Sequence, residues 1–137
     1  MKPARKPLDI ILPVTPGLTR AAHARLEAFA EATSLPRKVM FAADTALEEL
    51  LQNVLDYSGA HEVRLWVSVE CGELRLELAD DGRPFNPLEV RNPDLGQPFE
   101  LRPEGGLGVF LARKMMDRVG YEHRDGRNRL SLAKTLA

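Results

Sequence analysis

Residues 48–57 read EELLQNVLDY, and the interpretation of the whole chain starts from this stretch. At about 100° per residue in an α-helix, Glu49 and Asn53 differ by about 40° and share one face. An apolar stripe elsewhere on the same helix is formed by Leu47, Leu51 and Val54. A carboxylate and an amide one turn apart can serve one polar centre, the first as a proton acceptor and the second as an oxygen ligand for Mg²⁺. The alternative is an ordinary solvated helix face.

Hydrophobic periodicity around this stretch predicts the remaining elements. The helix begins near Ser34 and Pro36 and ends near Ser58-Gly59. Before it we expect an edge strand and an amphipathic helix with Thr15 as N-cap and Pro16 in its first turn; these are Leu8–Val14 and Leu18–Ala32. After it we expect two strands, a helix and a closing hairpin, at His61–Glu70, Leu74–Ala79, Gly106–Val119 and Tyr121–Leu136. This order predicts an α+β two-layer sandwich of a mostly antiparallel sheet and three helices.

The second motif, Asp80-Asp81-Gly82-Arg83-Pro84-Phe85, follows the strand that ends at Ala79. A carboxylate held at a strand end can accept an N–H from a ligand, and a glycine beside it lets a ring approach the backbone. The alternative is a simple strand-end turn, in which Asp and Gly are common.

The third motif is Gly105-Gly106-Leu107-Gly108, directly before a predicted helix. Exposed N–H groups and the positive end of the helix dipole suit a phosphate, although a flexible hinge would use the same glycines. It is not a Walker loop, because no Gly-Lys-Ser/Thr follows. A long loop rich in proline precedes it, and loops of this length in small domains are usually functional or mobile.

Length and composition limit the classes of protein to consider. The 137 residues predict one domain, 1–137, and the 19 Lys+Arg against 20 Asp+Glu argue against nucleic-acid binding through a broad basic surface.

No apolar run approaches ~18 residues, so no transmembrane helix is expected. The basic N-terminus is not typical of a secretory signal, and the cytoplasm is the expected location. Cys71 is the only cysteine, which excludes a Cys-based metal site, and we expect it to be a small buried apolar residue.

In their order and spacing, the three motifs resemble those of the GHKL ATP-binding fold, in particular of the bacterial anti-sigma-factor serine/threonine kinases. Residues 49–57 match that family's N box, and residues 80–85 match its first glycine box. Residues 105–108, Asp117 and residues 126–130 match the second glycine box and the closing hairpin. The resemblance extends from about Leu8 to Leu136.

The resemblance implies a role for each matching residue. Asn53 holds the Mg²⁺ that bridges the nucleotide phosphates, and Glu49 is the general base toward a hydroxyl nucleophile. Asp80 accepts a hydrogen bond from the adenine amino group, and Gly82 lines the same pocket. The phosphates are contacted by the second glycine box, with residues 86–104 as the ATP lid; its members are Gly105, Gly106, Leu107 and Gly108.

The activity implied by the resemblance is that of a protein serine/threonine kinase. It uses Mg-ATP to phosphorylate an antagonist protein, regulates transcription by partner switching, and has a sigma factor as a further partner and a homodimeric state. The alternative is an ATP-binding interaction module of the anti-sigma type without phosphoryl transfer. The ATPase domain of a histidine kinase is disfavoured, because no helix with a phospho-accepting His precedes the domain.

Overall fold

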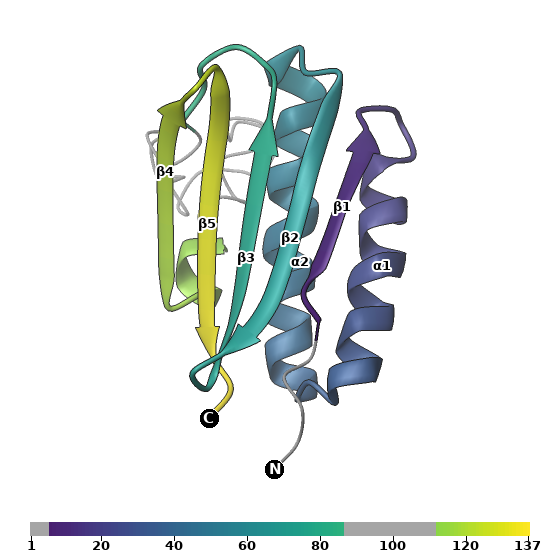
Figure 1. The fold of residues 1–137 in the computed structure, drawn as a ribbon, viewed down its shortest axis with the longest axis vertical. Helices are drawn as coiled ribbons and strands as arrows, with labels where there is room; N and C mark the ends of the chain where they lie inside the picture. The colour runs from purple at the N-terminus through teal and green to yellow at the C-terminus, as the bar shows by residue number, and fades with distance from the viewer. Residues whose placement is uncertain (1–5, 87–111) are drawn as a thin grey trace, which may run out of the picture.

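Alternating apolar side chains build the sheet at the centre of the molecule. The structure is a computed structural model that describes residues 6–86 and 112–137. Its sheet has five strands in the order β1-β2-β3-β5-β4, and all neighbours run antiparallel (Figure 1). The strands are β1 (Leu8–Pro13), β2 (Glu62–Glu70), β3 (Glu73–Asp80), β4 (Arg118–Arg124) and β5 (Arg127–Thr135).

The described helices cover one face of this sheet, and we call the other face, on which no described helix lies, the open face (Figure 1). The helices are α1 (Leu18–Thr33) and α2 (Arg37–Asn53), and α2 continues into one turn of π-helix, η1 (Val54–Ser58). The core lies between the layers, and side chains at most 2% exposed come from both, among them Leu26, Leu50, Leu65 and Leu76. The predicted α+β two-layer sandwich is therefore confirmed. No helix within the described residues is both long and apolar enough to cross a membrane.

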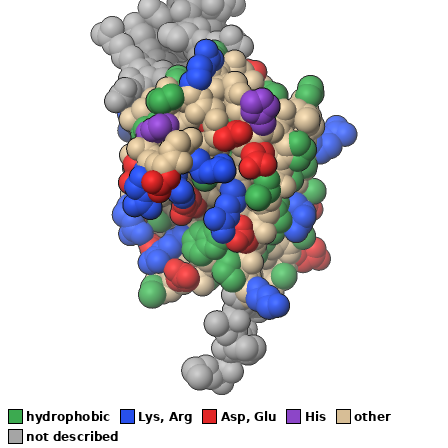
Figure 2. All heavy atoms as spheres, turned by 45° about the horizontal axis from the view of Figure 1, so that its top comes forward, with side chains coloured by type: hydrophobic (Ala, Val, Ile, Leu, Met, Phe, Trp, Pro, Cys, Tyr) green, Lys and Arg blue, Asp and Glu red, His purple; other side chains and the backbone are tan. Residues whose placement is uncertain are grey.

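The open face of the sheet is polar and of mixed charge. Figure 2 shows basic and acidic side chains interspersed on the surface that it presents. Cross-strand pairs account for part of this pattern, since Arg64 on β2 contacts Asp9 on β1 at 2.7 Å and Arg129 on β5 contacts Glu77 on β3 at 3.3 Å. This distribution agrees with the near-neutral net charge of the chain.

Three local expectations were wrong, and the start of α1 is the first. The helix begins at Leu18, with Gly17 rather than Thr15 at its N-cap position. The Thr15 hydroxyl accepts the Gly17 N–H at 3.3 Å, and the Thr15 carbonyl accepts the Leu18 N–H at 2.9 Å. These bonds form a turn around Pro16 that delays the helix by two residues.

Cys71 is exposed rather than buried. It forms the turn between β2 and β3 together with Gly72, and both residues have positive φ angles, 52° and 75°. Such a two-residue turn matches the right-handed twist of the strands, and it directs the cysteine side chain into solvent.

The helix expected over Gly106–Val119 ends earlier than predicted. Helical residues are described at 112–115, while the beginning of this segment lies outside the described residues. Val119 belongs to β4, where it pairs with Leu132 of β5. The chain is a strand rather than a helix here because pairing with β5 satisfies its backbone hydrogen-bonding groups. The first of these bonds is donated by the Asp117 N–H to the Ala133 carbonyl at 2.9 Å.

Candidate functional site

The last two turns of α2 carry the carboxylate and the amide that share one helix face. Asn53 is only 6% exposed, so the interpretation as a solvated face is wrong for this residue. The Asn53 side chain makes no hydrogen bond to any of the residues that the structure describes. Buried amides nearly always have a partner, so an amide without one retains its whole capacity for a ligand.

Glu49, one turn earlier, is half-buried. Burial raises the pKa of its carboxyl, and the negative charge of Glu48 raises it further. Both effects act in the same direction because each disfavours the ionised form. A carboxyl whose pKa is raised is a stronger general base than an ordinary surface glutamate.

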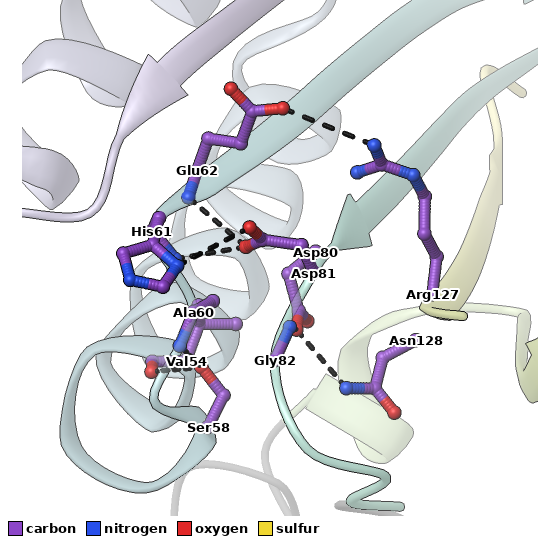
Figure 3. A network of polar contacts seen from close by, with 10 residues as sticks. All are labelled: Val54, Ser58, Ala60, His61, Glu62, Asp80, Asp81, Gly82, Arg127 and Asn128. Carbon is purple, nitrogen blue, oxygen red and sulfur yellow. Dashed lines mark hydrogen bonds and ion pairs between the residues drawn. The ribbon is translucent and has the colours of Figure 1, made fainter.

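The π-turn η1 closes α2 directly after Asn53. The Ser58 hydroxyl donates to the Val54 carbonyl at 2.6 Å and accepts the Ala60 N–H at 3.0 Å (Figure 3). Gly59 follows in the left-handed region, with φ 69°. π-turns accommodate an extra residue in a helix and are frequent at functional sites. This one leads the chain from the helix into β2, beside the end of β3.

The end of η1 is held against the second motif. The Arg83 N–H donates to the Ser58 carbonyl at 2.8 Å, and the Arg83 guanidinium donates to the Tyr57 carbonyl at 2.6 Å. A Cβ atom on Gly82 would lie 2.5 Å from the Ser58 carbonyl oxygen. Glycine is therefore required here by the approach of two backbone segments within the protein. These contacts bring the helix end and the strand end into one place.

We expect Gly82→Ala to lower the free energy of unfolding by about 1–3 kcal/mol, as overpacking typically does. The added methyl group would push against the backbone of Ser58, which cannot rotate away. Gly120→Ala is the matched control, because nothing lies within 4 Å of a Cβ at that position. Urea unfolding of both variants measures the difference, and equal stability of the two would contradict this interpretation of Gly82.

Asp80 ends β3 and is 3% exposed. Its Oδ1 atom accepts the Gly82 N–H at 2.9 Å and an N–H of the Asn128 side chain at 3.0 Å (Figure 3). Among the described residues, no hydrogen bond is made to its Oδ2 atom. One oxygen of this buried carboxylate is thus held by the protein, while the other remains available to accept a hydrogen bond.

Asn128 is a site residue that sequence reasoning missed. It lies on β5 opposite Asp80 and is 2% exposed. Besides Asp80, its amide nitrogen donates to the Arg83 carbonyl at 2.7 Å. Its amide oxygen accepts from the Phe85 N–H at 3.0 Å and from the Tyr121 hydroxyl at 2.5 Å. The available signal was its position: Asn128 shares the inward face of β5 with Leu130 and Leu132, where a polar residue is unexpected.

Asp81, next to Asp80, has a structural role. One of its carboxylate oxygens accepts the backbone N–H groups of His61 at 2.8 Å and Glu62 at 3.2 Å, at the start of β2 (Figure 3). The bond from Glu62, aided by the bond from His61, lowers the pKa of the Asp81 carboxyl. The two adjacent aspartates therefore have different roles: Asp80 faces inward, and Asp81 joins the end of β3 to the start of β2.

The remaining predicted site residues lie outside the described residues. These are the second glycine box and nearly all of the expected lid: Gly105, Gly106, Leu107, Gly108 and 87–104. Four hollows of about 190 to 550 Å³, formed by described residues, lie elsewhere, and none is lined by Glu49, Asn53 or Asp80. No group of three His, Cys, Asp or Glu side chains that could hold a metal ion occurs in residues 6–86 and 112–137.

The described residues thus combine an antiparallel sheet that has helices on one face with a buried amide at a helix end and a buried carboxylate at a strand end. The family model of the histidine kinase-like ATPase domain matches residues 12–134. The chain therefore belongs to this family.

Known relatives agree with this assignment. The chain is 29% identical to the serine/threonine-protein kinase BtrW of Bordetella bronchiseptica over 90 residues, which are 66% of this chain and 63% of that protein. It is 30% identical to the serine-protein kinase RsbW of Bacillus mycoides over 88 residues, 59% of this chain and 55% of that protein. The matches thus span less than two thirds of these relatives.

A solved structure shows the same fold. The crystal structure of the RsbU and RsbW domains of Rv1364c from Mycobacterium tuberculosis superposes with a TM-score of 0.67. The superposition covers 96% of this chain and 32% of that chain, at 16% sequence identity. At this identity the likeness concerns the fold alone.

Proposed function

We propose that the protein is a serine/threonine kinase of the anti-sigma type, which binds Mg-ATP and phosphorylates an antagonist protein. The observation that carries the proposal is the junction of η1 with the second motif. It joins the helix bearing Glu49 and Asn53 to the strand end bearing Asp80. The residues proposed as base, metal ligand and nucleobase acceptor thereby lie on elements that hydrogen bonds hold together, and phosphoryl transfer depends mainly on positioning. The names of the kinase relatives support the same activity.

In this proposal, Asp80 recognises the base of the nucleotide. Its Oδ2 atom, to which no described residue donates, accepts a hydrogen bond from the amino group of adenine, because an ionised carboxylate only accepts hydrogen bonds. Gly82 lies beside it and keeps the turn close to η1. The second glycine box binds the phosphates, and residues 86–104 form the lid; the box residues are Gly105, Gly106, Leu107 and Gly108.

Within the described residues, Asn53 is the one whose side chain we propose as a ligand of the magnesium ion. Its amide is buried and has no hydrogen-bond partner among the described residues, and amide oxygens are suitable Mg²⁺ ligands. One protein ligand suits Mg²⁺, which usually binds one or two protein groups together with substrate phosphates and water. The ion would neutralise charge on the phosphates.

We expect Asn53→Ala to lose the Mg²⁺-dependent part of ATP affinity, on the order of tenfold or more, as is typical for loss of a charge-linked contact. Calorimetric titration with ATP, in Mg²⁺ and in EDTA, measures this part directly. Wild type and variant are expected to bind equally in EDTA. Gln52→Ala is the matched control, because Gln52 is exposed and its side chain donates a hydrogen bond to Asp56 at 3.0 Å, away from the proposed site. If ATP affinity of Asn53→Ala still depended on Mg²⁺ as strongly as that of wild type, Asn53 would not be a ligand of the metal.

Glu49 is proposed as the general base. It takes the proton from the serine or threonine hydroxyl of the substrate protein as the oxygen attacks the terminal phosphorus. Its position one turn before Asn53 places it on the face that would hold the metal and phosphates. The rise in its pKa makes its carboxylate more basic than that of an exposed glutamate.

We propose protein partners rather than nucleic acid. They are an antagonist protein as the phosphorylated substrate, a sigma factor that the kinase sequesters, and a second copy of this chain in a homodimer. Strand β1 supports an interface at the first strand and helix, because it is an edge of the sheet and its Ile11 is 61% exposed. Such partner switching would take place in the cytoplasm, where ATP and transcription factors occur.

The experiment that tests the proposed function is a transfer assay with ATP labelled at its terminal phosphate. Wild-type protein, Mg²⁺ and candidate partner proteins are incubated, and label on the partner is analysed by phosphoamino-acid mapping. We expect label on serine or threonine that disappears in EDTA. Tight ATP binding without transfer to any partner would instead support an interaction module of the anti-sigma type. Absence of ATP binding would overturn both functions.

A further inference from the structure

The side-chain amide of Asn128 can adopt only one orientation in this structure. Its two acceptor positions are occupied by donors, the Phe85 N–H and the Tyr121 hydroxyl. On its other side lies the Arg83 carbonyl, which can only accept. A flipped amide would place its NH₂ group against the Phe85 N–H and its oxygen against the Arg83 carbonyl. All four hydrogen-bonding positions of the amide are therefore used within the protein.

This orientation controls the neighbouring carboxylate. Because the nitrogen of Asn128 must face Asp80, the protein donates two N–H groups to Asp80 Oδ1, one from Asn128 and one from Gly82. Both N–H donors favour an Asp80 carboxylate that only accepts hydrogen bonds, and they fix the orientation of its side chain. In this orientation Oδ2 is the oxygen available to a ligand. The two residues are opposite each other on β3 and β5, so the arrangement is part of the sheet.

We infer that Asn128 is a positioning residue that makes the site select 6-amino purines over 6-oxo purines. The inference rests on the proposed function, in which Asp80 accepts the adenine amino group. Asn128 does not contact the base, since its amide is saturated. It acts by holding Asp80 as an acceptor, which pairs with an amino group and repels the carbonyl oxygen of hypoxanthine or guanine.

An Asn128→Asp variant tests this inference with almost no change of volume. Two carboxylates in contact cannot both ionise readily and tend to share one proton. The shared proton lies between Asp80 Oδ1 and the new carboxyl group, so Asp80 loses negative charge and its Oδ2 atom becomes a weaker acceptor for the adenine amino group. Selectivity for ATP over inosine triphosphate should therefore fall. A hydrogen bond to a charged group corresponds to roughly ten- to a hundredfold in affinity, and this is the preference expected in wild type and lost in the variant.

The measurement is competition of ATP and inosine triphosphate against a fluorescent ATP analogue, for wild type and variants whose fold is verified by circular dichroism. Ser131→Asp is the matched control, because it adds the same charge to an exposed position of β5 and should keep the wild-type ratio. Should Asn128→Asp fail to fold, Asn128→Ala introduces no charge. It is expected to weaken ATP binding about tenfold without changing the weaker binding of inosine triphosphate.

The outcomes separate the inference from the proposed function. Wild type that prefers ATP, with a collapsed ratio in the Asn128 variants and an unchanged ratio in Ser131→Asp, supports the inference. Wild type that prefers ATP, with the same ratio in the Asn128 variants, overturns the role of Asn128 alone. Wild type that binds neither nucleotide, or binds both equally, overturns the assignment of Asp80 and with it the inference.

Discussion

Glu49→Gln is expected to slow phosphoryl transfer by roughly a hundred- to ten-thousandfold, the usual contribution of a general base. Glutamine has the same shape but cannot accept the proton of the attacking hydroxyl. Because Glu49 is not assigned to the nucleotide, ATP affinity should change little. Single-turnover transfer of labelled phosphate to the partner protein measures the rate, and equilibrium titration measures the affinity. Transfer at the wild-type rate would contradict the role of Glu49.

The stability of Glu49→Gln shows whether a loss of activity could come from unfolding. The pKa of Glu49 is raised in the folded protein, so its ionisation opposes folding. Stability therefore decreases as the pH rises from the ordinary glutamate pKa, about 4.3, through the folded value. Glu49→Gln removes this effect, and it should be at least as stable as wild type at neutral pH and show no such advantage in acid. A loss of activity in a protein of equal or higher stability cannot result from unfolding.

Asp80→Asn is the second change with a large expected effect, and it should abolish selective ATP binding. The Oδ1 position accepts two N–H groups, so the new amide will keep its oxygen there and its NH₂ group at the Oδ2 position. That NH₂ group would face the amino group of adenine, donor against donor. We expect ATP affinity to fall by about a hundredfold or more, which combines the loss of a charged hydrogen bond with an unpaired donor. The contacts to Gly82 and Asn128 should remain, and with them the fold.

The matched control is Asp81→Asn, the same chemical change one residue later. Asp81 accepts backbone N–H groups of β2, and these bonds lower its pKa, so its ionised form stabilises the fold. That contribution is present above the ordinary aspartate pKa, about 3.9, and is lost as the pH falls through the lower folded value. Asp81→Asn should therefore reduce stability at neutral pH without changing selectivity for ATP. Equal nucleotide affinity of both variants would contradict the division of roles between the two aspartates.

Local sequence patterns predicted much of the fold, and also the parts of the site that lie within one element. The one-turn spacing of Glu49 and Asn53 holds because α2 extends through Asn53. The strands predicted at His61–Glu70 and Leu74–Ala79 are found as β2 and β3. Errors occurred at the ends of elements, where competing bonds decide: Thr15 forms a turn instead of a cap, and Val119 joins a strand instead of a helix.

The sequence by itself determined the element order and the three polar motifs, because periodicity and turn chemistry act over a few neighbouring residues. Only the tertiary structure decided what these motifs do to one another. Asn128 and Asp80 are 48 positions apart in the chain, and they meet because β5 pairs with β3. Gly82 is required by a contact with Ser58, a residue of another element. Hydrogen bonds and close packing between distant segments depend on how the layers assemble, and in the part of the chain that the structure describes this assembly leaves the Oδ2 atom of Asp80 without a hydrogen bond.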